Sequence, residues 1–181
     1  PFHLGGLDGF PFAGITGMNA FAHHVPEDGA VLVFYAPHIG ITKDGNIGEI
    51  HRIGQSSNSA CCGAAKGALG KLLNNEIIEG NVTDLDYQQN TIEQIFLKQA
   101  NRIKTASNKI FEATEVMYEA IDMRMEELVK QTHYPCKYVL LVGAVFINGD
   151  KDMGSFCEYK KFDCLNLETG VRESLLKAYY Q

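Results

Sequence analysis

The sequence lacks a hydrophobic run long enough to cross a membrane. Its longest apolar stretch, residues 138–147, is about half of the roughly 20 residues that a membrane helix needs, so we expect a buried strand there. A basic surface for nucleic acid is missing as well, because 16 Lys and Arg stand against 22 Asp and Glu, a formal charge of -6. We therefore expect neither a membrane nor a nucleic acid as partner.

The cysteines do not form the even set of a disulfide framework. There are five of them: Cys61, Cys62, Cys136, Cys157 and Cys164. An odd number favours a reducing compartment, where clustered Cys and His indicate metal binding or catalysis. Neighbouring cysteines such as Cys61 and Cys62 lack the Cys-x-x-Cys spacing of redox centres, so a redox function is disfavoured.

The chain also has no internal repeat, charge block or low-complexity linker, so we expect a single domain over residues 1–181. It begins with Pro1 rather than an initiator Met, which predicts a processed chain with a segment missing upstream. Thirteen of its 18 glycines and five of its six histidines fall within the first 70 residues. The chemistry is therefore expected in that part of the sequence.

The remaining patterns predict ordinary strands and helices. Residues 30–36 (AVLVFYA) form a continuous apolar run typical of a buried strand. Similar reasoning predicts strands over 49–53, 138–147 and 155–165, and helices over 60–74, 84–103, 106–131 and 171–180. This order predicts an α/β fold with a mainly parallel sheet flanked by helices.

Two residues in this pattern have the chemistry of zinc ligands. His38 directly follows the strand at 30–36, and the carboxyl ends of strands are where α/β sheets gather functional groups. Cys62 lies where a loop becomes a helix, which stabilises a thiolate. A catalytic zinc holds three protein ligands and one water, and His38 and Cys62 supply two of them. The alternative is that His38 caps a loop and Cys62 is a small residue at a helix start.

Two further residues are candidates for catalysis. Asp8 stands in the Gly-rich loop Gly5-Gly6-Leu7-Asp8-Gly9, where its carboxylate is suited to hydrogen-bond a metal-bound water. A turn-forming Asp is the commoner explanation. Arg52 is suited to clamp bicarbonate, although most arginines at a strand end are solvated or structural.

Four motifs resemble one known family. They are FHLGGLDGFPFAG (2–14), AFAHHVPEDG (20–29), PHIGIT (37–42) and SACCGAAKGAL (59–69). Together they are similar to the low-CO2-inducible protein B family of algae, also described as Cys-Gly-His-rich or theta-type carbonic anhydrases. The resemblance implies a fold and zinc site like those of beta-type carbonic anhydrases, CO2 and bicarbonate as substrates, a homodimer or a heteromer with a paralogue, and a plastid location.

The resemblance extends to the site only in part. Cys62-Gly63-Ala64 resembles the end of the beta-type His-x-x-Cys-Gly motif, but Ser59 occupies the His position, so His38 becomes the candidate ligand. The beta-type Cys-x-Asp-x-Arg motif is absent, which leaves the first Cys ligand and the Asp-Arg pair open.

We expect the missing third ligand to be a cysteine upstream of Pro1. The alternatives within the chain are Cys157 and Cys164, which are seven residues apart on an expected strand and so should face opposite sides. The implied function is a zinc-dependent carbonic anhydrase that interconverts CO2 and bicarbonate through a zinc-bound hydroxide, with Asp8 and Arg52 orienting water and product. The alternative is an inactive zinc-binding structural or partner subunit of a CO2-concentrating assembly.

Overall fold

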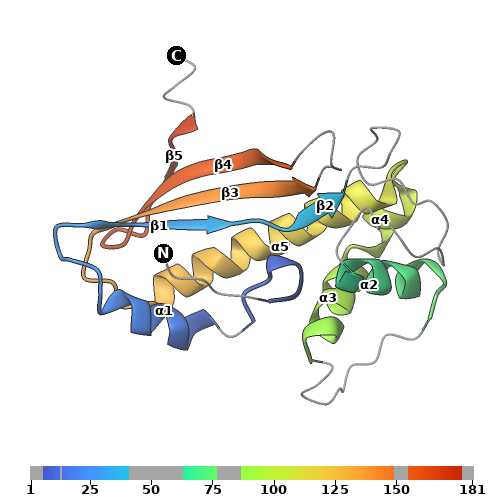
Figure 1. Ribbon diagram of the computed structural model, residues 1–181, viewed down its shortest axis with the longest axis horizontal. Coiled ribbons are helices and arrows are strands. Elements are labelled where there is room, and N and C mark those ends of the chain that lie inside the picture. The colour runs from blue at the N-terminus through green and yellow to red at the C-terminus, as the bar shows by residue number, and fades with distance from the viewer. Residues whose placement is uncertain (1–5, 13, 41–62, 77–86, 149–154, 177–181) are drawn as a thin grey trace.

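The structure of the protein is a computed structural model that describes residues 6–12, 14–40, 63–76, 87–148 and 155–176 (Figure 1). Its helices are the single turn η1 (Leu7–Gly9), α1 (Gly14–Ala22), α2 (Gly63–Leu73), α3 (Tyr87–Lys98), α4 (Ala100–Thr105) and α5 (Lys109–Gln131). Its strands are β1 (Ala30–Tyr35), β2 (His38–Gly40), β3 (Tyr138–Asn148), β4 (Phe156–Asn166) and β5 (Arg172–Ser174). Within these ranges no helix is both long and apolar enough to cross a membrane.

The strands form one sheet in the order β1-β3-β4-β5, and β2 continues the β1 edge by pairing with the end of β3. The predicted α/β class, with a sheet flanked by helices, is confirmed. The sheet is mixed rather than mainly parallel: β1 and β2 run parallel to β3, whereas β4 and β5 are antiparallel. The chain between β3 and β4 is too short for the crossover that a parallel pair requires.

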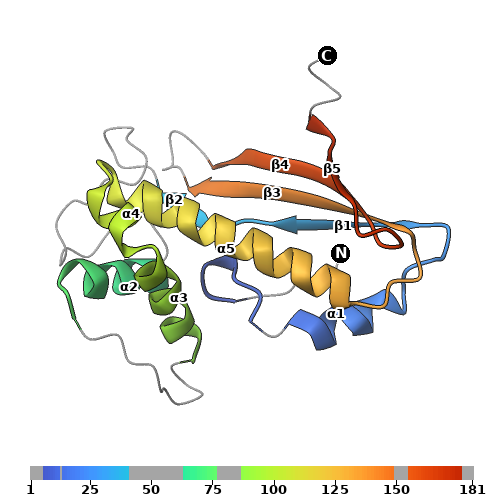
Figure 2. The same ribbon diagram turned by 180° about the vertical axis from the view of Figure 1, so that it is seen from behind.

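The described helices lie on one face of the sheet, and α5 runs along that face (Figure 1, Figure 2). The side chain of Asn108 caps the start of α5 by accepting the Phe111 N–H at 3.0 Å. The spacing of three and four residues predicted for this segment is confirmed, because its apolar positions are buried against the sheet. They include Ile110, Met117, Ile121, Met125 and Leu128.

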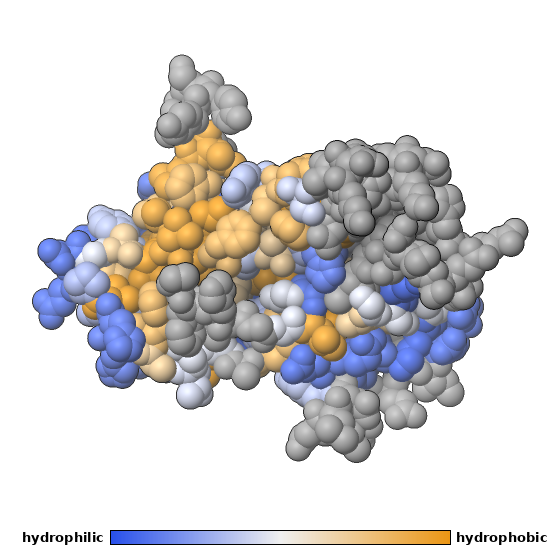
Figure 3. Space-filling model, viewed as in Figure 1, coloured by the Kyte–Doolittle hydropathy of each residue, from blue (hydrophilic) through white to orange (hydrophobic). Residues whose placement is uncertain are grey.

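The other face of the sheet carries no described helix and is apolar, as Figure 3 shows. We call it the open face. Strand alternation and register place on it Leu32 and Phe34 of β1, Tyr138, Leu140, Val142, Ala144 and Phe146 of β3, and Cys157, Tyr159, Phe162, Cys164 and Asn166 of β4. None of these residues is charged, and Glu173 of β5, which pairs with Cys164, adds one charge at the edge of this face. Leu32 is 61% exposed and Tyr159 65%, so large apolar side chains face outward here.

A network of charged side chains joins α5 to β4 and β5, at the edge of the sheet away from β1. Arg172 of β5 contacts Asp122 at 2.8 Å, Asp163 at 2.7 Å and also Glu126. Lys161 of β4 adds a contact with Asp122 at 2.6 Å. Arg172 and its partners are mostly buried, so this network ties β4 and β5 to the helix with charge-assisted hydrogen bonds.

Several sequence predictions are corrected by the structure. The helix expected over 171–180 is wrong where it is described, because Arg172–Ser174 is strand β5. Asn166 accepts the N–H groups of the two residues after Leu167, and Gly170 adopts φ 71, which together turn the chain back into a hairpin.

The helix expected over 84–103 is two helices, α3 and α4, which meet at Gln99. Helix α1 was not predicted, because its Gly-containing sequence (GITGMNAFA) is not typical of a helix. The strand expected over 49–53 lies outside the described residues.

Candidate functional site

The turn η1 places Asp8 against the end of β1. Asp8 adopts the left-handed conformation, φ 53 and ψ 32, which Asp tolerates better than most residues. Gly9 also has positive φ, at 75, and a Cβ there would overlap the carbonyl oxygen of Ala36. A glycine at this position therefore lets the turn pack directly on the strand end, and Asp8 is left only 4% exposed.

The carboxylate of Asp8 contacts His38, the first residue of β2. Its Oδ1 accepts the backbone N–H of His38 at 3.2 Å and lies 3.4 Å from the ring nitrogen Nδ1. The fold thus brings together two of the predicted site residues. The His38 side chain is 38% exposed, so its ring is held by Asp8 on one side and remains accessible on the other.

The ionisation of this pair favours a neutral imidazole. Burial raises the pKa of Asp8 to about 7, although the hydrogen bond from the His38 N–H lowers it in part. Burial lowers the pKa of His38. Near neutral pH the contact is therefore not an ion pair with a charged His38. The neutral ring is the form in which histidine binds metals.

The other two predicted site residues, Cys62 and Arg52, lie outside the described residues. The helix that follows Cys62 in the sequence is described. It is α2, which begins at Gly63, close to the predicted helix start. Helix α2 contacts the turn η1, which carries Asp8. The turn therefore touches both β2, through His38, and the helix next to Cys62 (Figure 1).

Cys157 and Cys164 lie on the same face of β4, which corrects the expectation that they face opposite sides. The pairing of β3 with β4 is irregular, so that Lys160 has no partner on β3 and counts as one extra residue in β4. This bulge shifts the alternation by one position between the two cysteines. Both then lie on the open face, a result that a strict period of two could not predict.

Of these two cysteines, Cys157 is nearer to His38. Both Cys157 and His38 pair with Phe146, from opposite sides of β3, whereas Cys164 pairs with Leu140. Two strand spacings separate the backbones of His38 and Cys157, roughly 10 Å, while Cys164 lies roughly 20 Å from Cys157 along the strand. If a cysteine of β4 approaches His38, it is therefore Cys157.

Among the described residues, one side chain is suited to bind zinc and a second is suited to orient it. Within the part of the chain that the structure describes, no three His, Cys, Asp or Glu side chains converge into a metal site. His38, however, has a carboxylate beside Nδ1, which is the usual arrangement of a histidine that binds zinc through its other ring nitrogen. His38 and Asp8 therefore have the chemistry of a ligand and the group that orients it.

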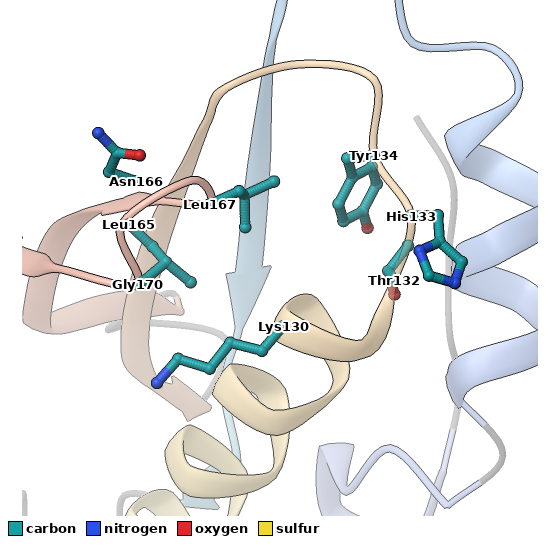
Figure 4. Close-up of a pocket in the computed structure, with 8 residues that line it drawn as sticks. All are labelled: Lys130, Thr132, His133, Tyr134, Leu165, Asn166, Leu167 and Gly170. Carbon is teal, nitrogen blue, oxygen red and sulfur yellow. The ribbon is translucent and has the colours of Figure 1, made fainter.

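A pocket of about 320 Å³ lies at the other end of the sheet, between the end of α5 and the hairpin of β4 and β5 (Figure 4). Leu165, Leu167 and the ring of Tyr134 form its interior. The Lys130 ammonium extends away from them and pairs with Glu126 at 2.6 Å. Thr132, His133 and Asn166 add polar groups to the lining, and the pocket is separate from Asp8 and His38.

Known proteins match the chain as follows. The family described as limiting CO2-inducible proteins B/C beta carbonic anhydrases matches residues 1–166. The crystal structure of PtLCIB4, a homologue of the limiting CO2-inducible protein LCIB, is 26% identical with a TM-score of 0.78, covering 96% of this chain and 73% of that one. A mutant of PtLCIB4 matches with the same identity and TM-score, at 97% and 72% coverage.

The crystal structure of LCIB itself shows the same fold, with 19% identity, a TM-score of 0.64, and 94% and 69% of the two chains covered. A comparison with curated proteins found no match. The resemblance seen in the Gly-, His- and Cys-containing motifs is confirmed, and the fold around Asp8 and His38 is that of the LCIB structures. The chain therefore belongs to the family of limiting CO2-inducible proteins B/C beta carbonic anhydrases.

Proposed function

We propose that this chain is a zinc-dependent carbonic anhydrase that interconverts CO2 and bicarbonate. The observation that carries the proposal is the pair of Asp8 and His38, a neutral imidazole held by a buried carboxylate at 3.4 Å. Family membership supports the reaction class. Zinc, when bound, acidifies a coordinated water so that hydroxide is available near neutral pH to attack CO2.

In this proposal each candidate site residue has a defined task. His38 binds zinc through Nε2, and Asp8 fixes the ring by accepting from the backbone N–H and lying beside Nδ1. Cys62 supplies a thiolate ligand and Arg52 orients bicarbonate; both assignments rest on the sequence. A third protein ligand is required, and Cys157 is the candidate among the described residues.

The test combines zinc content per chain with a stopped-flow assay of CO2 hydration. We expect stoichiometric zinc, together with hydration that a sulfonamide inhibits and a chelator abolishes. Stoichiometric zinc without hydration would instead support the second candidate, a zinc-binding structural or partner subunit of a CO2-concentrating assembly. A plastid location stays a prediction from the family resemblance.

We further propose that the protein is a homodimer, in which a second copy covers the open face. The apolar positions of the described helices between residues 87 and 131 are largely buried in the fold. Five exposed side chains of the open face instead present roughly 500 Å² of apolar surface, taking about 200 Å² for a whole aromatic side chain. They are Leu32, Phe34, Tyr138, Phe146 and Tyr159.

That area is a large part of the roughly 800 Å² that each partner buries in a stable interface. On β1, β3 and β4 the open face has no charged residue, and Glu173 of β5, opposite Cys164, stands at its edge, so two copies can bury the apolar centre without repulsion between like charges. Because His38 pairs with Phe146, the candidate site borders this surface.

A further inference from the structure

Helix α2 is held at both ends by a pair of polar residues from α3, Gln89 and Glu93. Nε2 of Gln89 donates to the carbonyl oxygen of Ala64, in the first turn of α2, at 3.1 Å. The same nitrogen donates to Oε1 of Glu93 at 3.2 Å. Oε1 of Glu93 in turn lies 2.9 Å from Nζ of Lys71, in the last turn of α2.

Glu93 is buried to a degree that is unusual for a carboxylate, with 2% of its surface exposed. Burying a carboxylate is costly, and its pairing with Lys71 and Gln89 offsets that cost without making the contact a strong source of stability. Apolar packing of α2 through Ala68 and Leu72 already holds the two helices together. The polar pair therefore fixes where α2 lies against α3 and contributes little to the stability of their packing.

Apolar packing alone leaves the position of α2 weakly defined, because the helix is rich in small residues. The amide group of Gln89 lies over Gly67, where a Cβ would come within 3.5 Å of Nε2. Small side chains interlock little, so the directional bond from Gln89 to Ala64 fixes the rotation and height of the first turn.

Helix α3 also contacts the loop that carries Asp8. The ring of Tyr87, the first residue of α3, packs edge-on against Phe12 with a centroid distance of 6.1 Å. Phe12 packs in turn against Phe10, two residues after Asp8, at 4.8 Å. One helix therefore touches both the Asp8 loop and the first turn of α2.

We propose that Gln89 and Glu93 are positioning residues of the zinc site, which set the helix start that follows Cys62 relative to Asp8 and His38. The inference rests on the proposed function, because it takes Cys62 as a ligand. It assigns no contact with zinc to either residue. The sequence signal is Glu93, a charged residue between the buried Ile92 and Phe96, with Gln89 four positions before it on the same side of α3.

The test replaces Gln89 with methionine, which keeps the length of the side chain and removes its donor. We expect the zinc dissociation constant of Gln89→Met to rise about tenfold, as for other residues that support metal ligands. We also expect the thiolate-to-metal band of the cobalt-substituted protein to shift. Gln88→Met is the matched control, because Gln88 is the preceding residue of the same helix and is exposed, and it should leave both readouts unchanged.

Two more variants keep the result interpretable. Glu93→Gln retains an acceptor for Gln89 but removes the charge that pairs with Lys71, so we expect a smaller loss of zinc affinity than in Gln89→Met. If Gln89→Met does not fold, Gln89→Asn takes its place, because the shorter side chain no longer reaches Ala64.

The outcomes separate this inference from the proposed function. Loss of zinc affinity in Cys62→Ser together with an unchanged affinity and spectrum in Gln89→Met would overturn the positioning role alone. An unchanged zinc affinity in Cys62→Ser would overturn both. Equal losses in Gln88→Met and Gln89→Met would also overturn the inference, since the effect would then not depend on the bond to Ala64.

Discussion

Asp8 holds His38 at two points, the backbone N–H at 3.2 Å and the ring nitrogen Nδ1 at 3.4 Å. The first contact fixes where β2 begins, and the second fixes the orientation of the imidazole. A turn with two consecutive positive φ values, at Asp8 and Gly9, makes both contacts possible. The strained turn therefore belongs to the same unit as the candidate ligand.

Replacing Asp8 by asparagine should weaken zinc binding while the fold persists. Asparagine tolerates the left-handed conformation and still accepts the His38 N–H, but its amide cannot supply the charge that an ionised Asp8 places beside Nδ1. We expect the zinc dissociation constant to rise at least about tenfold in a chelator competition experiment. Asp28→Asn, at an exposed position, is the control. An affinity within twofold of the wild type would remove Asp8 from the site.

Removing the charge of Asp122 should change how stability depends on pH. Burial alone would raise the pKa of Asp122, but hydrogen bonds from Lys161, Tyr35 and Arg172 outweigh it, so the pKa lies below 3.8. Such a carboxylate stabilises the fold above its unfolded pKa, and this stability is lost as the pH falls through the lower, folded value.

The wild type should therefore lose stability steadily below about pH 4. Asp122→Asn should cost about 2 kcal/mol at pH 7 and show a flatter profile at acid pH, because that contribution is already absent. Urea unfolding at a series of pH values measures both. Parallel profiles for the two proteins would show that Asp122 has no such role.

Adding a methyl group at Gly143 should destabilise the fold, because a Cβ there would come within 2.6 Å of the Tyr118 hydroxyl and 3.0 Å of the Tyr35 ring. We expect Gly143→Ala to cost about 1–3 kcal/mol in urea unfolding. Gly70→Ala is the control: nothing lies within 4 Å of its Cβ in α2, so that variant should gain about 0.5–1 kcal/mol. A neutral Gly143→Ala would mean that the tyrosines have room to move.

A charge on the open face should separate the proposed dimer. Leu32 is 61% exposed on that face, and a glutamate there would have to be buried without a partner. We expect Leu32→Glu to sediment as a monomer at micromolar concentration, where the wild type sediments as a dimer. Met123→Glu, at a position 67% exposed on α5, should remain dimeric. A monomeric wild type would contradict the proposal.

The sequence predicted the elements with strong local patterns. Apolar runs mark strands β1 and β3, and apolar residues three and four positions apart mark α5. Both patterns arise from burial in the core and can be recognised within each segment alone. Strand β5 could not be predicted, because its pairing depends on the turn at Asn166 and Gly170 rather than on its own composition.

The candidate site was predictable only as a list of residues. The position of His38 after a strand indicated its role, but its contact with Asp8 depends on the path of the turn η1. The bulge at Lys160, which puts Cys157 and Cys164 on one face, left no local pattern in the sequence. Glu93 was missed because an acidic residue in a helix normally faces water.

The central claim, that His38 binds zinc while Asp8 orients it, is tested most directly by the zinc dissociation constant of His38→Ala beside that of the wild type, measured by chelator competition. Losing one of the protein ligands should raise the constant at least about a hundredfold. The exposed His24→Ala variant should bind zinc as the wild type does. A dissociation constant for His38→Ala equal to that of the wild type would contradict the account.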